Sequence, residues 1–437
     1  MKQGYIPNDP HRKFAKSLQV LEQAKRVIPA QTQTFSKGWT QYPLGVSPVF
    51  AARTDGGYVW DVDGNKFIDW PMALGPLLLG HNNRHVNDAV RRQLDLGIAF
   101  SLPHQAEVEL AERLIAWFPY AEGVRFGKNG SDVTAAAVRA ARAFTGRDIV
   151  LCCGYHGWQD WFIGTTTRNR GVPDAVRELT IPFGYNDLVG LERLLKVHAG
   201  KVACIIMEPI GIIAPQPGYL EGVKKLAEAN GAILVFDECW CGFRLHKQGA
   251  FGKYGVAPHL SCFGKAIGNG VPISIILGRA DIMAVFEDIF FSFTYGGDLL
   301  GIAAANAVMD VFEQEPVLEK IEKIGQALID GVVDLAKKHK IDSHVGIGGY
   351  AGRNIMTFKD DEADGLLLKS IFQQEALCHG VLAAGWHAPC YAHSMDDVRT
   401  TLRAYDEAFA AIARGLSVGN LRGLLHGQQV QQVFRKP

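Results

Sequence analysis

The sequence predicts an α/β protein, with a mostly parallel sheet flanked by helices. Short apolar runs bounded by polar turns recur at residues 148–153, 202–207, 232–236 and 274–278. Amphipathic helical patterns lie between several of them, for example over residues 220–231. Strands of a parallel sheet are buried on both faces and read as continuous apolar runs, and the helices that connect them cover the sheet. This alternation therefore favours a parallel sheet with helices on both faces.

Both ends of the chain are expected to form a second, smaller α+β domain. Residues 58–70 alternate around Asp63-Gly64 and predict a β-hairpin. Long helical patterns at 316–340 and 395–416 are separated by glycine-rich short strands. The 437 residues, 48% of them hydrophobic, suffice for one large and one small domain. We assign residues 1–70 and 316–437 to the small domain, and residues 71–315 to the large one.

The charge balance excludes several classes of partner. Lys and Arg total 45, as do Asp and Glu, so no net basic field favours nucleic acid or an anionic membrane. The first twenty residues lack the apolar segment of a signal peptide, and no long uncharged apolar run occurs. We expect a cytoplasmic protein whose partners are small molecules and copies of itself. Its eight cysteines lack the paired spacing of a zinc site, so no metal is expected.

Three polar side chains directly follow apolar runs. They are Glu208 after 202–207, Asp237 after 232–236, and Lys265 in the segment 261–270. Ligands of parallel sheets bind beyond the carboxyl ends of the strands. Any one of these residues alone could be a strand-end charge in solvent. Because Asp237 and Lys265 both precede glycine-containing loops, we interpret them as parts of one site.

Residues 125–147 contain the pattern of a helix start that suits a phosphate group. Asn129 to Asp132 resemble a turn with an N-cap, and the alanine-rich run that follows predicts a helix. Exposed N–H groups at a helix start suit a phosphate, although an ordinary capped helix has the same pattern. A glycine-containing loop at 291–301 runs into another helix.

A lysine, a buried carboxylate and a phosphate cradle together indicate pyridoxal 5'-phosphate (PLP). The lysine forms a Schiff base with the aldehyde, and the carboxylate keeps the ring nitrogen protonated. The freed lysine can then move the substrate proton. Asp237 would end a buried strand because an ion pair with a pyridinium needs a rigid, partly desolvated carboxylate.

The motifs together resemble the fold-type I, class III aminotransferases, and most closely the glutamate-1-semialdehyde aminomutase subgroup. The similarity covers nearly the whole chain and rests on five motifs in the family's order. They are "FGKNGSDVTAAAVRAARAFTGR", "CCGYHGW", "GAILVFDECWCGFR", "LSCFGKAIGNGVP" and "SFTYGGD". The resemblance implies a PLP-dependent transferase fold with a large cofactor domain and a small domain.

The resemblance also implies roles for individual residues. Lys265 matches the Schiff-base lysine and Asp237 the partner of the pyridine nitrogen, so both are the expected catalytic residues. The other implied cofactor contacts are Gly130 and Ser131 at the phosphate, Tyr155 and Cys239 on opposite faces of the ring, Glu208 near the cofactor, and Thr294. Thr294 matches a threonine that reaches the phosphate of the other subunit, which implies a homodimer with shared active sites.

The departures from the family pattern concern the phosphate loop and the substrate. "KNGSD" and "GGDLL" replace the family's Asn-Ser-Gly-Thr-Glu and "SGNP" patterns. Lys37 stands where the aminomutase has an arginine for the substrate carboxylate, and a lysine cannot form that two-pronged contact. His387 stands where the aminomutase has a glutamate. Lys37 and His387 are the predicted substrate-binding residues.

These replacements resemble a branch of the family associated with surface-polysaccharide biosynthesis. We therefore expect transfer from an amino-acid donor such as glutamate to a sugar-like or polyol-like carbonyl acceptor, phosphorylated or not. The alternatives are an aminomutase acting within one substrate, and a cofactor-free binding protein. The presence of both Lys265 and Asp237 counts against the last. Whether His156 acts in the site or only packs is left open.

Overall fold

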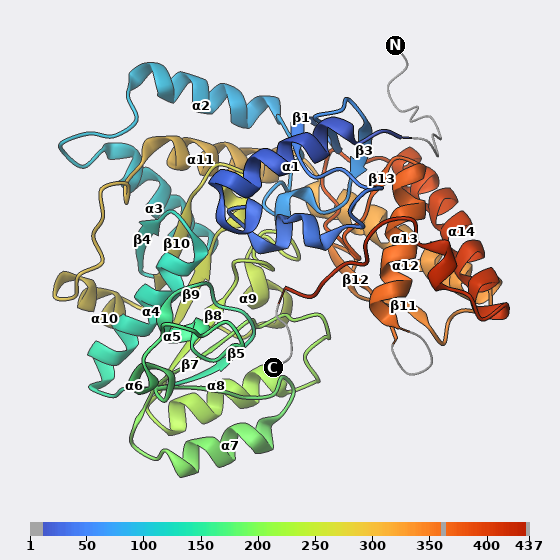
Figure 1. Cartoon of the computed structure of the whole chain (residues 1–437). Coiled ribbons are helices and arrows are strands. Elements are labelled where there is room, and N and C mark those ends of the chain that lie inside the picture. The colour runs from blue at the N-terminus through green and yellow to red at the C-terminus, as the bar shows by residue number, and fades with distance from the viewer. Residues whose placement is uncertain (1–11, 360–363, 434–437) are drawn as a thin grey trace. The chain divides into compact units, whose positions relative to one another are not determined.

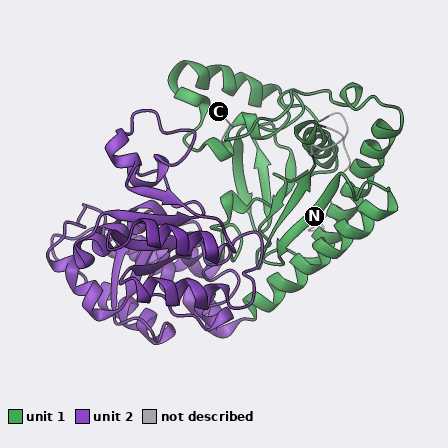
Figure 2. Cartoon of the chain, turned by 90° about the horizontal axis from the view of Figure 1, so that it is seen from below, with its two compact units in different colours: residues 1–83, 316–435 green, residues 84–315, 436–437 purple. Residues whose placement is uncertain are grey.

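The computed structural model describes residues 12–359 and 364–433, which form two compact units (Figures 1 and 2). The large unit is Arg84–Glu315, and the small unit combines the two chain ends, as far as Asn83 and from Pro316 onward. Residues 71–83, assigned above to the large domain, group with the small unit. There Leu78 accepts a backbone hydrogen bond from Tyr391, and His81 forms a bridge with Gly56. Residues 1–11 of the predicted N-terminal segment lie outside the described residues.

The large unit contains a seven-stranded sheet in the order β4-β10-β9-β8-β7-β5-β6. The strands are β4 (Gly123–Gly127), β5 (Ile149–Cys153), β6 (Thr180–Pro182), β7 (Val202–Met207), β8 (Ile233–Asp237), β9 (Leu260–Phe263) and β10 (Ser274–Gly278). The prediction of a mostly parallel sheet is confirmed, because β6, β5, β7, β8 and β9 pair in parallel. β10 is antiparallel to both β9 and β4. The segment between β9 and β10 is too short for a crossover helix.

Helices cover the sheet, and its central strands are fully buried. α4 (Gly130–Thr145) packs on β7, β9 and β10, where its alanines and Val133 meet alternate strand residues such as Cys204 and Cys262. α8 (Tyr219–Ala229) packs on β8. All residues of β7, β8 and β10 are buried, as continuous apolar runs predict.

The other helices of this unit connect strands or lie beside them. They are α2 (Arg84–Leu96), α3 (Gln105–Trp117), α5 (Asp160–Ile163), α6 (Asp174–Arg177), α7 (Leu188–Val197), α9 (Gly249–Tyr254), η5 (Lys265–Gly268), α10 (Ala280–Met283), η6 (Ala284–Glu287) and α11 (Leu299–Gln314). α2 and α3 both pack on α11.

Within its described residues, the small unit has two sheets and four long helices. Its strands are β1 (Ala51–Asp55), β2 (Tyr58–Asp61), β3 (Lys66–Asp69), β11 (Val345–Tyr350), β12 (Arg353–Phe358), β13 (Val381–Leu382) and β14 (Trp386–His387). Its helices are α1 (Ala15–Val27), α12 (Val317–Lys338), α13 (Gly365–Cys378) and α14 (Met395–Ser417), with short turns η1 (Pro29–Gln31), η2 (Phe35–Lys37), η3 (Trp39–Gln41), η4 (Met72–Leu74) and η7 (Arg422–Leu424). The predicted hairpin is confirmed, because β2 and β3 pair antiparallel. A core of apolar side chains from α12, α13 and α14 surrounds Trp70.

The topology of the large sheet places six strand ends at one edge. β6, β5, β7, β8 and β9 run in the same direction, and β10 reverses between β9 and β4, so β4 runs in that direction too. The polar segments that follow these strands therefore gather beyond one edge of the sheet. Ligand sites of such sheets occur at this edge.

Candidate active site

Each predicted cofactor residue of the large unit, except Thr294, follows a strand that ends at this edge. Gly130 and Ser131 follow β4, Tyr155 follows β5, Glu208 follows β7, Asp237 ends β8, and Lys265 and the preceding Gly264 follow β9. In the sheet, Asp237 pairs in register with Cys262, so Lys265 follows the strand directly beside it. The sheet topology thus gathers these residues from distant parts of the sequence.

The Asp237 carboxylate is buried and doubly hydrogen-bonded. His156 Nδ1 lies 2.8 Å from its Oδ2, and the backbone N–H of Cys239 donates to its Oδ1 at 3.0 Å. A carboxylate only accepts, so Nδ1 of His156 carries the proton. Burial alone would raise the pKa of Asp237, but the contact with His156, the Cys239 N–H and the positive charge of Lys265 hold that pKa below its usual value. Asp237 is therefore a buried anion.

His156, whose role was left open, is positioned by packing. Its ring is 1% exposed and stacks on Trp161 with centroids 6.0 Å apart. Its backbone carbonyl accepts from the Thr134 hydroxyl at 2.8 Å, which ties the segment after β5 to α4. In the sequence, the only indication of a role for His156 is its position beside Tyr155, after a predicted strand.

Glu238, the second carboxyl group at the end of β8, has a different environment. Oε1 accepts the N–H of Ala250 at 2.7 Å, and the Cys241 thiol lies 2.9 Å from Oε2. Gly249, at φ +59°, leaves room for it, because a Cβ there would lie 2.5 Å from Oε1. Burial raises the pKa of Glu238 to about 7. Glu238 thus anchors the 238–250 loop, a role that sequence reasoning missed.

Lys265 begins the turn η5 in an unusual backbone conformation. Its φ is +46°, in the left-handed region that residues with a Cβ rarely adopt. Its Nζ lies 5.9 Å from the centroid of the Trp240 ring. Trp240 was not predicted; the only signal was an aromatic residue in the loop directly after Asp237. The turn thus places the amine beside an aromatic ring. The amine is also close enough to Asp237 for its positive charge to lower the pKa of that carboxyl group.

The start of α4 has the geometry of an anion site. Asp132 Oδ2 accepts the N–H groups of Lys128 at 3.1 Å and Asn129 at 2.7 Å. The next two N–H groups, of Gly130 and Ser131, belong to the first turn of the helix, where N–H groups have no acceptor within the helix. A Cβ at position 130 would lie 2.8 Å from Cys239 Sγ, so the close approach requires glycine.

The segment after β5 lies between α4 and Glu208. Gly157 has φ +106°, and a Cβ there would lie 2.5 Å from that of Ser131. Glu208 Oε1 accepts the N–H of Tyr155 at 3.1 Å. The Tyr155 side chain is half-exposed and packs edge-on against Phe162. Glu208 therefore positions the Tyr155 backbone while the ring stays accessible.

Cys239 offers an uncharged side chain at the same edge. It is buried, and its burial, together with the negative charge of Asp237, raises the pKa of its thiol well above the usual value.

Among the described residues, no group of three or more His, Cys, Asp and Glu is arranged to hold a metal ion. Within residues 12–359 and 364–433, no helix combines the length and apolar character needed to cross a membrane.

Thr294 lies in the exposed turn before α11. Asp298 closes this loop: it accepts the N–H of Gly301 at 3.0 Å and forms an ion pair with Lys128 at 2.9 Å. Phe293 and Tyr295, on either side of Thr294, are also exposed. The loop is thus fixed at its base and displays Thr294 at its tip.

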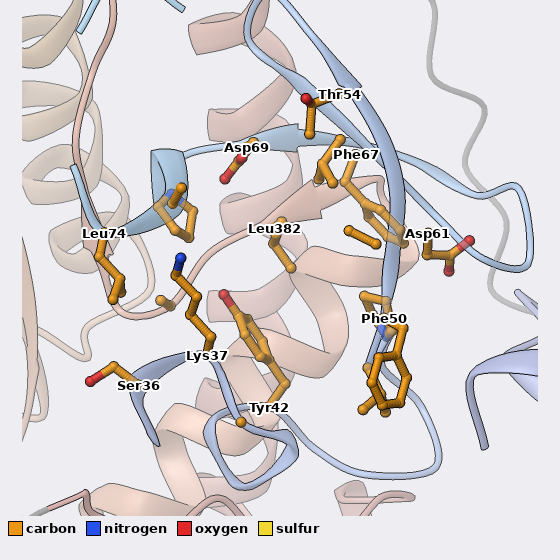
Figure 3. A pocket seen from close by; sticks show the side chains of 18 of the residues that line it. Ser36, Lys37, Tyr42, Phe50, Thr54, Asp61, Phe67, Asp69, Leu74 and Leu382 are labelled. Carbon is orange, nitrogen blue, oxygen red and sulfur yellow. The ribbon is translucent and has the colours of Figure 1, made fainter. Parts of the chain in front are cut away.

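The two predicted substrate residues lie in the small unit. Lys37 is exposed and lines a cavity of about 350 Å³ (Figure 3). His387 is fully buried: its Nδ1 lies 2.6 Å from Asn354 Oδ1 and its Nε2 2.7 Å from the Tyr405 hydroxyl. Burial, with the charge of His393, lowers the pKa of His387 to about 3. This geometry gives no support to substrate binding by His387, which stays a prediction.

The large-unit site fits PLP. A phosphate needs backbone N–H donors that no side chain covers. The start of α4 provides them at Gly130, which lies close to Cys239. A pyridinium needs a buried carboxylate that stays ionised, and the contacts of Asp237 keep it so. A primary amine for the aldehyde follows the adjacent strand. These three groups together match what a PLP site on a parallel α/β sheet requires.

Comparison with known proteins names the family. The model of the aminotransferase class-III family matches residues 42–395, so the chain belongs to this family, whose members are PLP-dependent aminotransferases. The 3-aminobutyryl-CoA aminotransferase of Cloacimonas acidaminovorans is 33% identical over 92% of this chain and 99% of its own length. The glutamate-1-semialdehyde 2,1-aminomutase of Syntrophobacter fumaroxidans is 33% identical over 84% of this chain and 92% of its own.

Solved structures agree with this assignment. The PLP internal aldimine form of the FumI protein from Sphingopyxis sp. MTA144 superposes with a TM-score of 0.86, at 30% identity over 92% of this chain and 97% of that one. The chain is therefore a fold-type I, PLP-dependent class III aminotransferase. The link to surface-polysaccharide biosynthesis stays a prediction.

Proposed function

We propose that the protein moves an amino group from an amino-acid donor to the carbonyl group of a separate acceptor molecule, and that Lys265 and Asp237 carry the chemistry. The observation that carries this proposal is the buried, ionised Asp237, held by His156 on the strand next to Lys265. Bound PLP supplies an electron sink for the substrate's α-carbon. Every other task falls to the residues of the chain.

Asp237 fixes a negative charge where the ring nitrogen would lie. His156 donates to Oδ2 and the Cys239 N–H to Oδ1, so the carboxylate cannot rotate without losing both hydrogen bonds. Because the carboxylate is buried, its charge acts through a medium of low dielectric constant, and its electrostatic interaction with a nearby cation is strong. This arrangement supports a protonated ring nitrogen throughout the reaction.

The other predicted contacts hold the cofactor in place. The N–H groups of Gly130 and Ser131 would bind the phosphate, with the dipole of α4 behind them. The accessible ring of Tyr155 would cover one face of the pyridine ring, and the uncharged Cys239 the other. Glu208 contributes by fixing the Tyr155 backbone.

Lys265 would bind the aldehyde and, once free, carry the proton at Nζ. The left-handed turn at Lys265 and the nearby Trp240 ring limit where Nζ can go. A proton-transfer group must stay within hydrogen-bond reach of the carbon it serves, so such a restriction assists the transfer. Trp240 would act as a positioning residue.

We further propose that active sites form in a homodimer. Thr294 stands at the tip of an exposed loop with two exposed aromatic neighbours, which suits a contact with a second copy. In the dimer, its hydroxyl would reach the phosphate bound by the partner subunit, as the family resemblance implies.

The acceptor is proposed to carry an anionic group that Lys37 recognises. The relatives include both an aminotransferase and an aminomutase, so their names do not select the acceptor. Lys37 in place of the aminomutase arginine favours a substrate other than glutamate 1-semialdehyde, because the two-pronged contact is lost. The sequence resemblance suggests a phosphorylated sugar or polyol for surface-polysaccharide synthesis, and glutamate-1-semialdehyde 2,1-aminomutase activity is the alternative.

Three measurements test this function. Borohydride reduction and peptide mass mapping should find a phosphopyridoxyl group on Lys265, and label on another lysine would contradict the assignment. A screen of amino donors against the PLP-loaded protein, followed optically, should show donor-dependent conversion of the cofactor. Glutamate 1-semialdehyde should be converted roughly ten- to a hundredfold less efficiently than the true acceptor. Efficient 5-aminolevulinate formation without a donor would establish the mutase instead.

A further inference from the structure

The loop that carries Thr294 is held at both ends by the strand that leads into α4. It connects η6 to α11 and contains no helix or strand (Figure 1). Near its first end, the Arg125 guanidinium of β4 donates to the Phe291 carbonyl at 2.7 Å. At its other end, Lys128, directly after β4, forms the ion pair with Asp298 at 2.9 Å. The exposed tip of the loop lies between these two contacts.

The contact between Lys128 and Asp298 differs from a surface ion pair. The two side chains are only 22% and 12% exposed, so water screens their charges poorly. The same Oδ1 atom of Asp298 that meets Lys128 Nζ also accepts the N–H of Gly301, and so caps α11. Removing either partner would leave a largely buried charge without compensation. The pair therefore ties the start of α11 to the segment before α4.

The backbone of Lys128 belongs to the turn that forms the start of α4. Its N–H donates to Asp132 Oδ2 at 3.1 Å, and the same oxygen accepts the N–H of Asn129 at 2.7 Å. Gly130, whose N–H is expected at the phosphate, follows two residues after Lys128. A displacement of Lys128 would therefore shift the N–H groups proposed to bind the phosphate. The side chain of Lys128 holds the loop, while its backbone holds the start of the helix.

Both partners stand at positions where the family pattern has asparagine. Lys128 replaces the first residue of Asn-Ser-Gly-Thr-Glu, and Asp298 replaces the asparagine of "SGNP". Two departures that lie 170 residues apart in the sequence thus meet in one contact. Two asparagines could form only a neutral hydrogen bond there, whereas an ammonium and a carboxylate form a charge-assisted one that is roughly twice as strong.

We propose that the ion pair of Lys128 and Asp298 couples the phosphate-binding start of α4 to the loop that carries Thr294, and that both are positioning residues for the cofactor. This inference rests on the proposed cofactor site, since it adds two residues to those that determine PLP affinity. A phosphate held by the N–H groups of Gly130 and Ser131 should order the loop. An ordered loop should in turn strengthen phosphate binding, because such coupling acts equally in both directions.

Two measurements on the full-length protein test the coupling. Equilibrium dialysis of the PLP-loaded protein gives the PLP dissociation constant, and hydrogen–deuterium exchange gives the opening of residues 291–298 with and without PLP. Asp298→Asn keeps a capping side chain at α11 but removes its charge, and Lys128→Asn removes the opposite charge. Each change should raise the PLP dissociation constant about tenfold, because a charge-assisted contact is lost. Each should also speed exchange of the loop in PLP-loaded protein.

The signs of the two effects distinguish this coupling from a direct action of the charges on the phosphate. Acting only through space, Lys128→Asn would weaken PLP binding, and Asp298→Asn would strengthen it by leaving the ammonium free. Tighter PLP binding by Asp298→Asn would therefore overturn the proposal. An unchanged dissociation constant in both variants would overturn it as well, because the pair would then be only a structural contact.

A double variant and a control complete the test. Lys128→Asn combined with Asp298→Asn removes both charges, so its PLP dissociation constant should rise no more than that of either single variant. Additive effects would contradict a coupling through this ion pair. Lys196→Asn breaks an exposed ion pair with Glu192 on α7 and should change neither measurement.

The measurements also separate this inference from the cofactor site on which it rests. Wild-type protein that is labelled at Lys265 after borohydride reduction, but whose loop exchanges equally fast with and without PLP, would contradict the inference alone. Absence of label on Lys265 would contradict the proposed function, whatever the exchange of the loop.

Discussion

The two carboxyl groups at the end of β8 in the large unit are buried and paired, whereas the cavity of the small unit contains an exposed, unpaired lysine. Asp237 is held by His156 and a backbone N–H, and Glu238 by Ala250 and Cys241. Lys37 has no such partner among the residues described. A group that acts in every turnover benefits from fixed partners, because no reorganisation is then needed. A group that recognises a changing ligand must leave its charge available.

The largest expected effect comes from removing the fixed charge. Asp237→Asn keeps the shape but neutralises the carboxylate, so the donor half-reaction should fall by roughly 10² to 10³-fold while PLP stays bound through its phosphate. Stopped-flow absorbance with the donor measures the rate. Asp334→Asn, an exposed position of α12, serves as the control. A near wild-type rate in Asp237→Asn would show that the buried charge is dispensable.

The second prediction concerns Thr294, the predicted cofactor residue that lies in an exposed loop of the large unit. Co-expression of Lys265→Ala with Thr294→Ala should produce heterodimers in which one of the two sites has both native residues. With half of the dimers mixed, about a quarter of wild-type activity is expected, above that of either parent alone. Activity assays and analytical ultracentrifugation of the tagged heterodimer measure this. A fully active monomer would contradict the shared site.

The third prediction concerns stability and Glu238. Its folded pKa of about 7 lies above the ordinary value, so protonation favours the folded state. The resulting stability is fully present below pH of about 4.5 and is lost as pH rises through about 7. Glu238→Gln, which mimics the protonated group, should therefore gain on the order of 1 to 3 kcal/mol relative to wild type between pH 5 and pH 8.

Urea unfolding at the two pH values measures this difference. Glu322→Gln, an exposed position on α12, should show no comparable change between them. If Glu238→Gln behaved like this control, the buried carboxyl group would not be coupled to folding.

Four strands of the large sheet, β5, β7, β8 and β10, could be predicted because burial on both faces leaves continuous apolar runs in the sequence. The direction of β10 could not, since an apolar run has the same appearance in a parallel and an antiparallel strand. The pairing of Asp237 with His156 was also inaccessible, because it depends on β5 and β8 flanking β7 in space. Sequence reasoning placed both residues after strands without the order of those strands.

The residues that bind substrate were harder to predict, for a related reason. Lys37 was identified only through an alignment, and its apolar surroundings come from β2, β3 and a segment more than 300 residues away in the sequence. His387 was selected in the same way, yet it lies in the core with Asn354 and Tyr405. Alignment shows which residue occupies a position; packing decides whether solvent or a ligand can reach it.

The backbone at Lys265 has an evolutionary consequence. A left-handed conformation costs a residue with a Cβ about 1 kcal/mol or more, and glycine adopts it at little cost. Selection for thermal stability alone would therefore replace this lysine by glycine. The role proposed for Lys265 would explain why the chain has a lysine here in spite of this penalty. A variant of the chain selected for stability without selection for the proposed activity would be expected to exchange Lys265 for glycine early.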